Sequence, residues 1–502
     1  MKNAPEWSRR SFLGTAGGAA LAAAVGLPRV TFASASSELD TLDAVGQAEL
    51  VRTRQASPLE LLDACVARLE RVNPQINAVV SEFLDRARKT AKGSLPKSPL
   101  SGVPYLIKDL VGVKAEKMTA GSRLLSEYKS PDTSPAAAAA MRAGLVIFGK
   151  TNTCEFGLLP STESVLLGPA RNPWNLDYST GGSSGGAAAA VAAGVLPVAH
   201  ATDAGGSIRV PASCCGLFGL KTSRFRVPNP DPMDGAPDVE FCVSRTVRDS
   251  AMMLSLSEDR TRHASLKPVG YVSGAAPQRL KIAFCTQNIF GAQPDSEVRA
   301  MLADAARLCE SLGHRVVEVN NPVDGEKFLE AFGVLWGLAP RWGVDQAKKQ
   351  HLNPADVLEP WTLGLAQQVE GKSAADIAQA VAYCKSLEKQ IDEFMAPYDV
   401  WLTPVTFSPS PRIGELAPTV EFTKLKQRVM QYLSYTPVQN ATGAPAMSVP
   451  LHWTKGGLPF GSHFSAKLGG EATLLSLAYE LEQARPWGNR RPPVSALGGA
   501  TG

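Results

Sequence analysis

The chain has 502 residues, with 51 Lys and Arg against 47 Asp and Glu and a formal net charge of +4. Hydrophobic residues make up 44% and charged residues 20%, a composition that is typical of globular proteins and excludes a long disordered or collagen-like chain. A surplus of four positive charges is too small to indicate a nucleic-acid partner.

The first 35 residues predict an export signal. Ser8-Arg9-Arg10-Ser11 is followed by an apolar run of small residues over 14–27 and by Ala33-Ser34-Ala35. A basic start, a short apolar stretch and a small-residue cleavage site are typical of such signals, and paired arginines indicate the twin-arginine route. The run is shorter than the roughly 20 residues that span a bilayer. We therefore expect cleavage after Ala35, no membrane span in the mature protein, and a periplasmic or secreted location.

Export would remove most of the basic excess, because this segment holds Lys2, Arg9, Arg10 and Arg29 against Glu6. The mature chain is then close to neutral. This fits an uncharged small-molecule substrate and gives no support to nucleic acid or membrane as a partner.

Helix and strand patterns alternate along the rest of the chain. Ser57-Pro58-Leu59-Glu60 is a capping-box pattern with proline at the first helical position, which predicts a helix that ends at Val72, before Asn73-Pro74. The alternation favours an α/β fold around a mostly parallel sheet. The further predicted elements are strands over 103–107, 146–148 and 280–284 and helices over 135–143, 296–312 and 471–483.

The cysteines do not form a metal-site pattern. No C-x-x-C pair occurs and the six histidines are scattered, so the spacing of zinc and iron–sulfur sites is absent. Most cysteines lie in apolar runs, which favours buried free thiols, although an oxidising compartment leaves a disulfide open. The eight are Cys65, Cys154, Cys214, Cys215, Cys242, Cys285, Cys309 and Cys384.

The densest chemical signal is a pair of segments rich in glycine and serine. Gly181-Gly182-Ser183-Ser184-Gly185-Gly186 precedes an alanine-rich helix pattern, and Asp203-Ala204-Gly205-Gly206-Ser207-Ile208-Arg209 follows shortly after. Glycine lets backbone amides approach a ligand closely, and clustered amides form oxyanion holes or phosphate cradles.

Three interpretations of these segments are weakly supported. A phosphate loop lacks the G-K-[ST] ending. A nucleophile elbow with Ser184 as nucleophile matches residues 182–186, but residues 175–180 are turn-like where that motif needs a strand, and no HGG-type segment precedes them. A Ser-x-x-Lys acyl enzyme lacks the accompanying S-D-N motif, and its pattern recurs by chance. That pattern occurs at Ser94 and Lys97, Ser126 and Lys129, and Ser386 and Lys389.

A fourth interpretation rests on several motifs together. Gly102-Val103-Pro104 with Lys108-Asp109, and the two segments above, resemble the motifs of the amidase signature family. The resemblance runs from about residue 40 to 490, and it implies that family's fold. That fold is a single large α/β domain over 36–502, with a mixed, mostly parallel twisted sheet covered by helices on both faces. Further matching segments are Lys150-Thr151-Asn152, Asn172-Pro173-Trp174, residues 245–249 and residues 442–446.

The resemblance also implies roles for single residues. Ser207 would be the acyl-forming nucleophile, Ser183 a bridging serine after a cis Gly182–Ser183 bond, and Lys108 the general base. Asp203 and Arg209 would support the loop by hydrogen bonds. No cofactor or metal enters this scheme. The oxyanion would be stabilised by the amides of Ala204, Gly205, Gly206 and Ser207.

The chemistry of such a site needs no histidine. A serine hydroxyl is a weak nucleophile until a base takes its proton, and a buried lysine with a lowered pKa can be that base. The chain departs from the family pattern Pro-Thr-x-Gly-Arg-Val-Pro over residues 222–228, where Phe225 replaces the glycine. We predict that Phe225 reshapes the substrate entrance.

The C-terminal segments over 461–464, 471–474 and 480–487 look most similar to the 6-aminohexanoate-cyclic-dimer hydrolase subgroup. Trp336 is a candidate wall of an apolar pocket, with a buried helix face as the alternative. We expect hydrolysis of a small, uncharged, apolar amide, linear or cyclic.

Two rival functions remain. One is a glutamine-hydrolysing amidotransferase subunit, against which the export signal argues. The other is a non-catalytic binding protein, against which retention of Lys108, Ser183 and Ser207 argues. The oligomeric state stays open, with a homodimer among the options.

Overall fold

The computed structural model describes residues 42–228, 238–260 and 266–497. The largest sheet within these residues has eight strands in the order β12-β11-β13-β15-β14-β9-β10-β8. A three-stranded sheet, β1-β3-β2, lies beside it with β2 next to β8. The strands are β1 (Val79–Glu82), β2 (Pro104–Lys108), β3 (Val146–Thr151), β8 (Val198–Asp203), β9 (Phe218–Lys221), β10 (Val239–Ser244), β11 (Lys281–Phe284), β12 (Arg315–Glu318), β13 (Val400–Pro404), β14 (Ala446–Trp453) and β15 (Pro459–Ser465). Two short ribbons pair β4 (Glu163–Ser164) with β5 (Gly168–Pro169) and β6 (Arg171–Asn172) with β7 (Asn175–Ser179).

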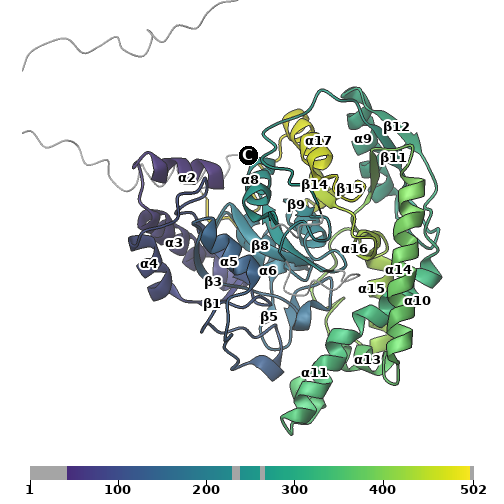
Figure 1. Cartoon of the computed structure of the whole chain (residues 1–502), viewed down its shortest axis with the longest axis horizontal. Coiled ribbons are helices and arrows are strands. Elements are labelled where there is room, and N and C mark those ends of the chain that lie inside the picture. Colours follow the sequence, from purple (N-terminus) through teal and green to yellow (C-terminus); the bar gives the residue numbers. More distant parts are fainter. Residues whose placement is uncertain (1–41, 229–237, 261–265, 498–502) are drawn as a thin grey trace, which may run out of the picture.

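Helices cover both faces of the large sheet. Every residue of β13 and β15 is buried, and successive side chains of a strand point to opposite faces. In Figure 1, α2 to α5 gather around β1 and β3 on the left, and α10 and α14 lie side by side on the right. The helices are α2 (Ala44–Arg52), α3 (Pro58–Ile76), α4 (Leu84–Lys92), α5 (Pro135–Arg142), α6 (Gly185–Ala192), α7 (Arg209–Cys215), α8 (Val247–Ser257), α9 (Ser296–Ser311), α10 (Gly325–Trp336), α11 (Leu338–Lys349), α12 (Pro354–Val357), α13 (Pro360–Gln368), α14 (Ala374–Phe394), α15 (Phe422–Tyr432), α16 (Pro437–Ala441) and α17 (Glu471–Ala484), with single 3-10 turns η1 (Arg123–Leu125) and η2 (Glu155–Gly157).

The α/β class and the mixed sheet are confirmed, but the expected predominance of parallel strands is wrong. In the eight-stranded sheet β11 pairs in parallel with β12 and β13, whereas the other five pairs are antiparallel. The alternation of helix and strand patterns suggested crossover connections throughout. Antiparallel neighbours need only a turn, and the turn over 454–458 joins β14 to β15.

Local helix signals predict starts better than stops. Ser57 caps α3 through the predicted capping box, in which Ser57 Oγ accepts from the Glu60 amide at 3.2 Å. The predicted stop at Val72 is wrong, because α3 runs through Pro74 and ends where Asn77 adopts a left-handed conformation. The helices at 135–143, 296–312 and 471–483 and the strands at 103–107 and 280–284 differ from the structure by at most one residue at each end.

All eight cysteines are buried and unpaired. Among the described residues, no helix combines the length and apolarity needed to cross a membrane. The predicted export signal over 1–35 lies outside the described residues.

Candidate active site

Lys108 and Ser183 are in direct contact. Lys108 ends β2, and its side chain is fully buried. Its Nζ lies 2.7 Å from Ser183 Oγ and 2.8 Å from Oγ1 of Thr202 on β8. The Gly182–Ser183 peptide bond is cis. The fold thus brings together two of the three side chains for which the family resemblance implies a catalytic role.

Contact with a serine distinguishes Lys108 from the two other lysines that are fully buried in the described residues. Lys150 Nζ donates to the carbonyl oxygen of Val111, and Lys221 Nζ donates to two backbone carbonyl oxygens at 2.9 Å. A carbonyl has no proton to give, whereas a hydroxyl has one. The contacts of Lys108 are therefore those that suit a general base.

Burial also makes Lys108 a better base near neutral pH. Loss of hydration lowers the pKa of the Lys108 ammonium to about 8, because a charged amine is costly in an apolar surrounding. Nearby acidic groups oppose part of this shift, and they belong to Cys154, Asp203, Asp238 and Glu240. A far larger share of Lys108 is neutral at pH 7–8 than of an exposed lysine, whose pKa is about 10.4.

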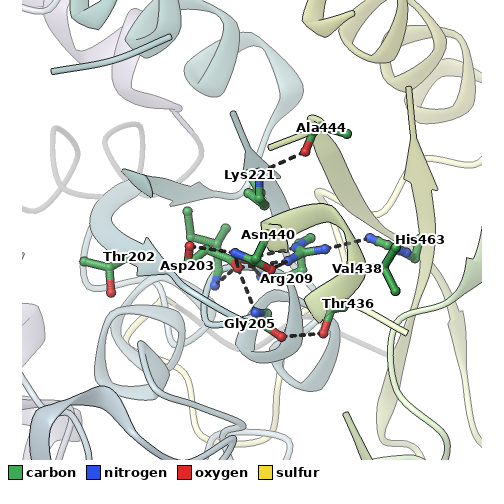
Figure 2. A network of polar contacts seen from close by, with 12 residues as sticks. Thr202, Asp203, Gly205, Arg209, Lys221, Thr436, Val438, Asn440, Ala444 and His463 are labelled. Carbon is green, nitrogen blue, oxygen red and sulfur yellow. Dashed lines mark hydrogen bonds and ion pairs between the residues drawn. The ribbon is translucent and has the colours of Figure 1, made fainter. Parts of the chain in front are cut away.

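Asp203 organises the loop that carries Ser207 (Figure 2). Its Oδ1 accepts a hydrogen bond from the Gly206 amide at 2.7 Å, and its Oδ2 accepts one from the Ile208 amide at 3.1 Å. Arg209 donates to both carboxylate oxygens at 2.9 Å. Although burial alone would raise it, the Arg209 guanidinium holds the pKa of Asp203 well below its usual range. The two residues lie where the predicted supporting role requires them.

Residues of the C-terminal third join this network, and sequence reasoning missed them. Asn440 Nδ2 donates to the carbonyl oxygen and to Oδ1 of Asp203, at 2.9 Å each, and Asn440 Oδ1 accepts from Arg209 at 2.6 Å. Thr436 Oγ1 donates to the carbonyl oxygen of Gly205 at 2.7 Å. The one available signal was that Asn440 lies just before the motif over 442–446.

His463 supports Arg209 from β15. Burial and the positive charge of Arg209 lower the pKa of His463 well below its usual value, so its imidazole is neutral. An arginine can only donate, so His463 Nε2 accepts from Arg209 at 3.0 Å, and the opposite Nδ1–H donates to Thr403 Oγ1 at 2.9 Å.

The predicted oxyanion hole needs one correction. The Gly206 amide is bonded to Asp203, so it is not available to an oxyanion in this structure. The amides of Ala204, Gly205 and Ser207 have no protein partner within the described ranges. Gly206 serves the loop in another way, because it has φ 135° and a Cβ there would lie 2.4 Å from Thr436 Oγ1.

An apolar cavity of about 370 Å³ opens beside this loop. Gly182 and Ala204–Ser207 line it, and Ser207 is half-buried. Trp336 lies in the wall, with its ring centroid 6.2 Å from that of Phe332 and 5.9 Å from that of Trp361. Volume and lining suit a small organic molecule. Further apolar wall residues are Phe156, Leu159, Leu335, Ile377, Val381 and Met430.

Phe225 is not among the described residues that line this cavity, and its place at the substrate entrance stays a prediction. Its neighbours anchor the turn elsewhere. The Ser223 amide donates to the Glu471 carboxylate at 2.8 Å, and Arg226 donates to the same carboxylate at 3.1 Å. Phe225 has φ 65°, a left-handed conformation that the family's glycine adopts without strain.

The hydroxyl of Ser184, the alternative nucleophile, is hydrogen-bonded to the backbone of β8. Its Oγ donates to the Thr202 carbonyl oxygen and accepts from the Thr202 amide, both at 3.2 Å, and the residue is fully buried. The expectation that 175–180 is only turn-like is wrong, because Asn175–Ser179 forms β7. Among the strands of the described residues it pairs with β6 alone, and an isolated bridge joins its Tyr178 to Arg412, so it is not the central strand that an elbow needs.

Comparisons with known proteins identify the family. The sequence model of the family described as Amidase matches residues 60–475. The chain is 39% identical over 461 residues to the protein named "Putative amidase AmiC" of Mycobacterium tuberculosis (strain ATCC 25618 / H37Rv), covering 91% of this chain and 97% of that one. It is 36% identical over 484 residues to the 6-aminohexanoate-cyclic-dimer hydrolase of Paenarthrobacter ureafaciens, covering 90% and 96%.

A solved structure of 6-aminohexanoate cyclic dimer hydrolase complexed with substrate matches with a TM-score of 0.84 at 32% identity, covering 91% of this chain and 99% of that one. The fold and these relatives define a hydrolase that acts on carbon–nitrogen bonds other than peptide bonds. The chain belongs to the Amidase family, and the resemblance inferred from its motifs is confirmed.

Proposed function

We propose that the chain hydrolyses amides through Ser207, Ser183 and Lys108 by an acyl-enzyme route. Ser207 Oγ attacks the amide carbon while its proton passes through Ser183 to Lys108 Nζ. The carbon–nitrogen bond then breaks, and the proton returns by the same route to the leaving amine. Water attacks the Ser207 ester, its proton again passes to Lys108, and the acid leaves as Ser207 regains a proton.

The 2.7 Å contact between Lys108 Nζ and Ser183 Oγ is the observation that carries this proposal. No carboxylate lies within ion-pair distance of Lys108 in the described residues. A buried ammonium without a paired anion is costly, so the site favours the neutral amine more than water does. A neutral amine in contact with a hydroxyl is positioned to accept its proton.

The substrate that fits this site best is a small, uncharged, apolar amide, linear or cyclic. The cavity beside Ser207 has mainly apolar walls that include Trp336, and such walls gain free energy by covering apolar rather than charged groups. The relatives named 6-aminohexanoate-cyclic-dimer hydrolase support an amide of this kind. Of the amides of the predicted oxyanion hole, those of Ala204, Gly205 and Ser207 would stabilise the developing oxyanion.

The rival functions fit less well. A non-catalytic binding protein gives no reason for a buried lysine in contact with Ser183. A glutamine-hydrolysing subunit of a cytosolic complex is at odds with export. We propose the twin-arginine route and a periplasmic or secreted location, on the pattern over residues 8–35 alone.

A hydrolysis screen of the purified protein tests the proposed activity. Aliphatic, aryl, lactam and peptide amides are incubated with the wild type, with Ser207→Ala, and with Ser213→Ala as a nearby buried serine control. We expect release of amine from small apolar amides that is lost in Ser207→Ala and kept in Ser213→Ala. Hydrolysis that survives Ser207→Ala would contradict the assignment of the nucleophile.

A further inference from the structure

His200 and Glu240 are buried next to each other, and within the described residues His200 Nδ1, His200 Nε2 and Glu240 Oε2 make no hydrogen bond. His200 on β8 is the register partner of Cys242, and Glu240 on β10 is the register partner of Thr202. Opposed residues of an antiparallel pair project to one face. His200 Nε2 lies 3.9 Å from Glu240 Oε2, which is too far for a hydrogen bond.

These polar atoms are orphaned despite their burial. The side chains are only 3% and 10% exposed. Neither ring nitrogen of His200 nor Oε2 of Glu240 has a hydrogen-bond partner in the part of the chain that the structure describes. Unsatisfied buried polar atoms are rare in native proteins, and each one points to an ordered water or to a functional role.

A cavity of about 20 Å³ lies against both side chains. That volume has room for one water molecule, which needs polar partners to stay there. Glu240 Oε2 and His200 Nε2 supply two acceptors for its two protons. The rest of the lining includes Tyr105 and Met253, and α5 contributes only alanines.

Thr202 links this pair to Lys108, the base of the proposed mechanism. Thr202, the register partner of Glu240, contacts Lys108 Nζ through its Oγ1 at 2.8 Å. Lys108 therefore approaches the same face of the β8–β10 ladder on which Glu240 and His200 lie.

We propose that Glu240 is a positioning residue for Lys108. The Glu240 carboxylate, anchored by a water shared with neutral His200, stabilises the protonated form of Lys108. It thereby sets the pH range in which Lys108 acts as a base. This inference rests on the proposed function of Lys108.

The surrounding charges support the proposal. Burial and the charge of Asp238 raise the pKa of Glu240 to about 7, and Lys108 opposes that rise. Burial, Lys108 and Lys150 lower the pKa of His200 to about 3. Glu240 is thus ionised, and His200 neutral, in the range above pH 7 where Lys108 loses its proton. The other ionisable groups that act on Lys108 or Glu240 are those of Tyr105, Cys154, Asp203 and Asp238.

The test is the pH profile of kcat/KM for Glu240→Gln, from pH 5.5 to 10, on an amide that the wild type hydrolyses. Without the carboxylate, protonated Lys108 is less stable and becomes a weaker base. The acid limb of the profile, where kcat/KM rises with pH, should move to lower pH by roughly half a unit or more. The plateau value of kcat/KM above it should fall about threefold. A purely structural defect would lower the whole curve and leave the limb in place.

Further variants separate the loss of the Glu240 charge from other effects of the substitution. Glu240→Leu, which leaves no buried amide to satisfy, should move the limb in the same direction as Glu240→Gln, and Glu240→Asp should move it less. Glu318→Gln, on β12 at the opposite edge of the sheet, should leave the profile unchanged. An unmoved acid limb in both uncharged variants would overturn the role of Glu240. If hydrolysis persists in Ser207→Ala, the proposed function fails instead, so the two failures are distinguishable.

Discussion

Asn440 donates two hydrogen bonds to Asp203, one to its backbone carbonyl oxygen and one to Oδ1, at 2.9 Å each. The partners are 237 residues apart in the chain. The contact ties α16 to the end of β8 (Figure 2), and thereby to the loop that carries Ser207. Because one side-chain amide holds both the backbone and the side chain of Asp203, Asn440 fixes the orientation of the Asp203 carboxylate toward the backbone amides of Gly206 and Ile208.

Replacing Asn440 should therefore damage catalysis more than substrate binding. In Asn440→Ala we expect kcat to fall about 10- to 100-fold with KM changed less than threefold, since a misplacement of about 1 Å costs on the order of a hundredfold. The control is Asn73→Ala, which removes an asparagine that bonds the backbone near β1. That variant should lose stability and keep kcat. Equal losses of kcat in the two variants would argue against a positioning role for Asn440.

The pH dependence of the reaction should report Lys108. Its pKa, lowered by burial to about 8, means that the amine is protonated below this pH and neutral above it. Because only the neutral amine accepts a proton, kcat/KM should fall about tenfold per pH unit below pH 8 and level off above it.

Lysine variants identify the group that titrates. Lys108→Arg should lose activity by at least about 100-fold at every pH, because a guanidinium stays charged. Lys150→Met removes a buried lysine whose Nζ donates to the carbonyl oxygen of Val111, and it should keep the acid limb at the same pH. Activity that is independent of pH between 6 and 9 would contradict lysine as the base.

The apolar wall should select the substrate. Trp336 lies in the cavity wall, whereas Trp342 is 48% exposed and lies outside it. Trp336→Ala should reduce kcat/KM for the largest apolar amide by about 10- to 100-fold and for the smallest by much less, because the loss follows the apolar contact removed. Trp342→Ala is the matched control. If both variants change the order of substrate preference alike, the cavity is not the binding site.

The predicted place of Phe225 at the substrate entrance can be tested directly. Its left-handed φ of 65° costs a non-glycine residue about 1–2 kcal/mol, and its half-buried ring offsets part of that. Phe225→Gly should leave kcat/KM within about twofold of the wild type, because the ring does not line the cavity. We expect the free energy of unfolding in urea to change by less than about 1 kcal/mol. A large rise in KM would support the place of Phe225 at the substrate entrance.

The sequence predicted the features that depend on short segments. Ser57 and Glu60 indicated the start of α3, and the resemblance of the motifs around Lys108 and Ser183 to the amidase signature family implied that the two side chains meet. Strand direction was mispredicted, because pairing between β8 and β10 or between β9 and β14 depends on contacts far apart in sequence. Asn440, Thr436 and His463 were missed for the same reason, since no local pattern shows that they will face Asp203 and Arg209. The hydrogen bond from the Gly206 amide to Asp203 could not be predicted either, because it depends on where the Asp203 carboxylate points.

The central claim is that Ser207 is the nucleophile. The most direct measurement is labelling of the wild type with a fluorophosphonate, followed by peptide mapping of the adduct by mass spectrometry. We predict a single adduct on Ser207, absent in Ser207→Ala and slowed at least about tenfold in Lys108→Ala. An adduct on Ser184, or no adduct on a protein that hydrolyses amides, would contradict the account.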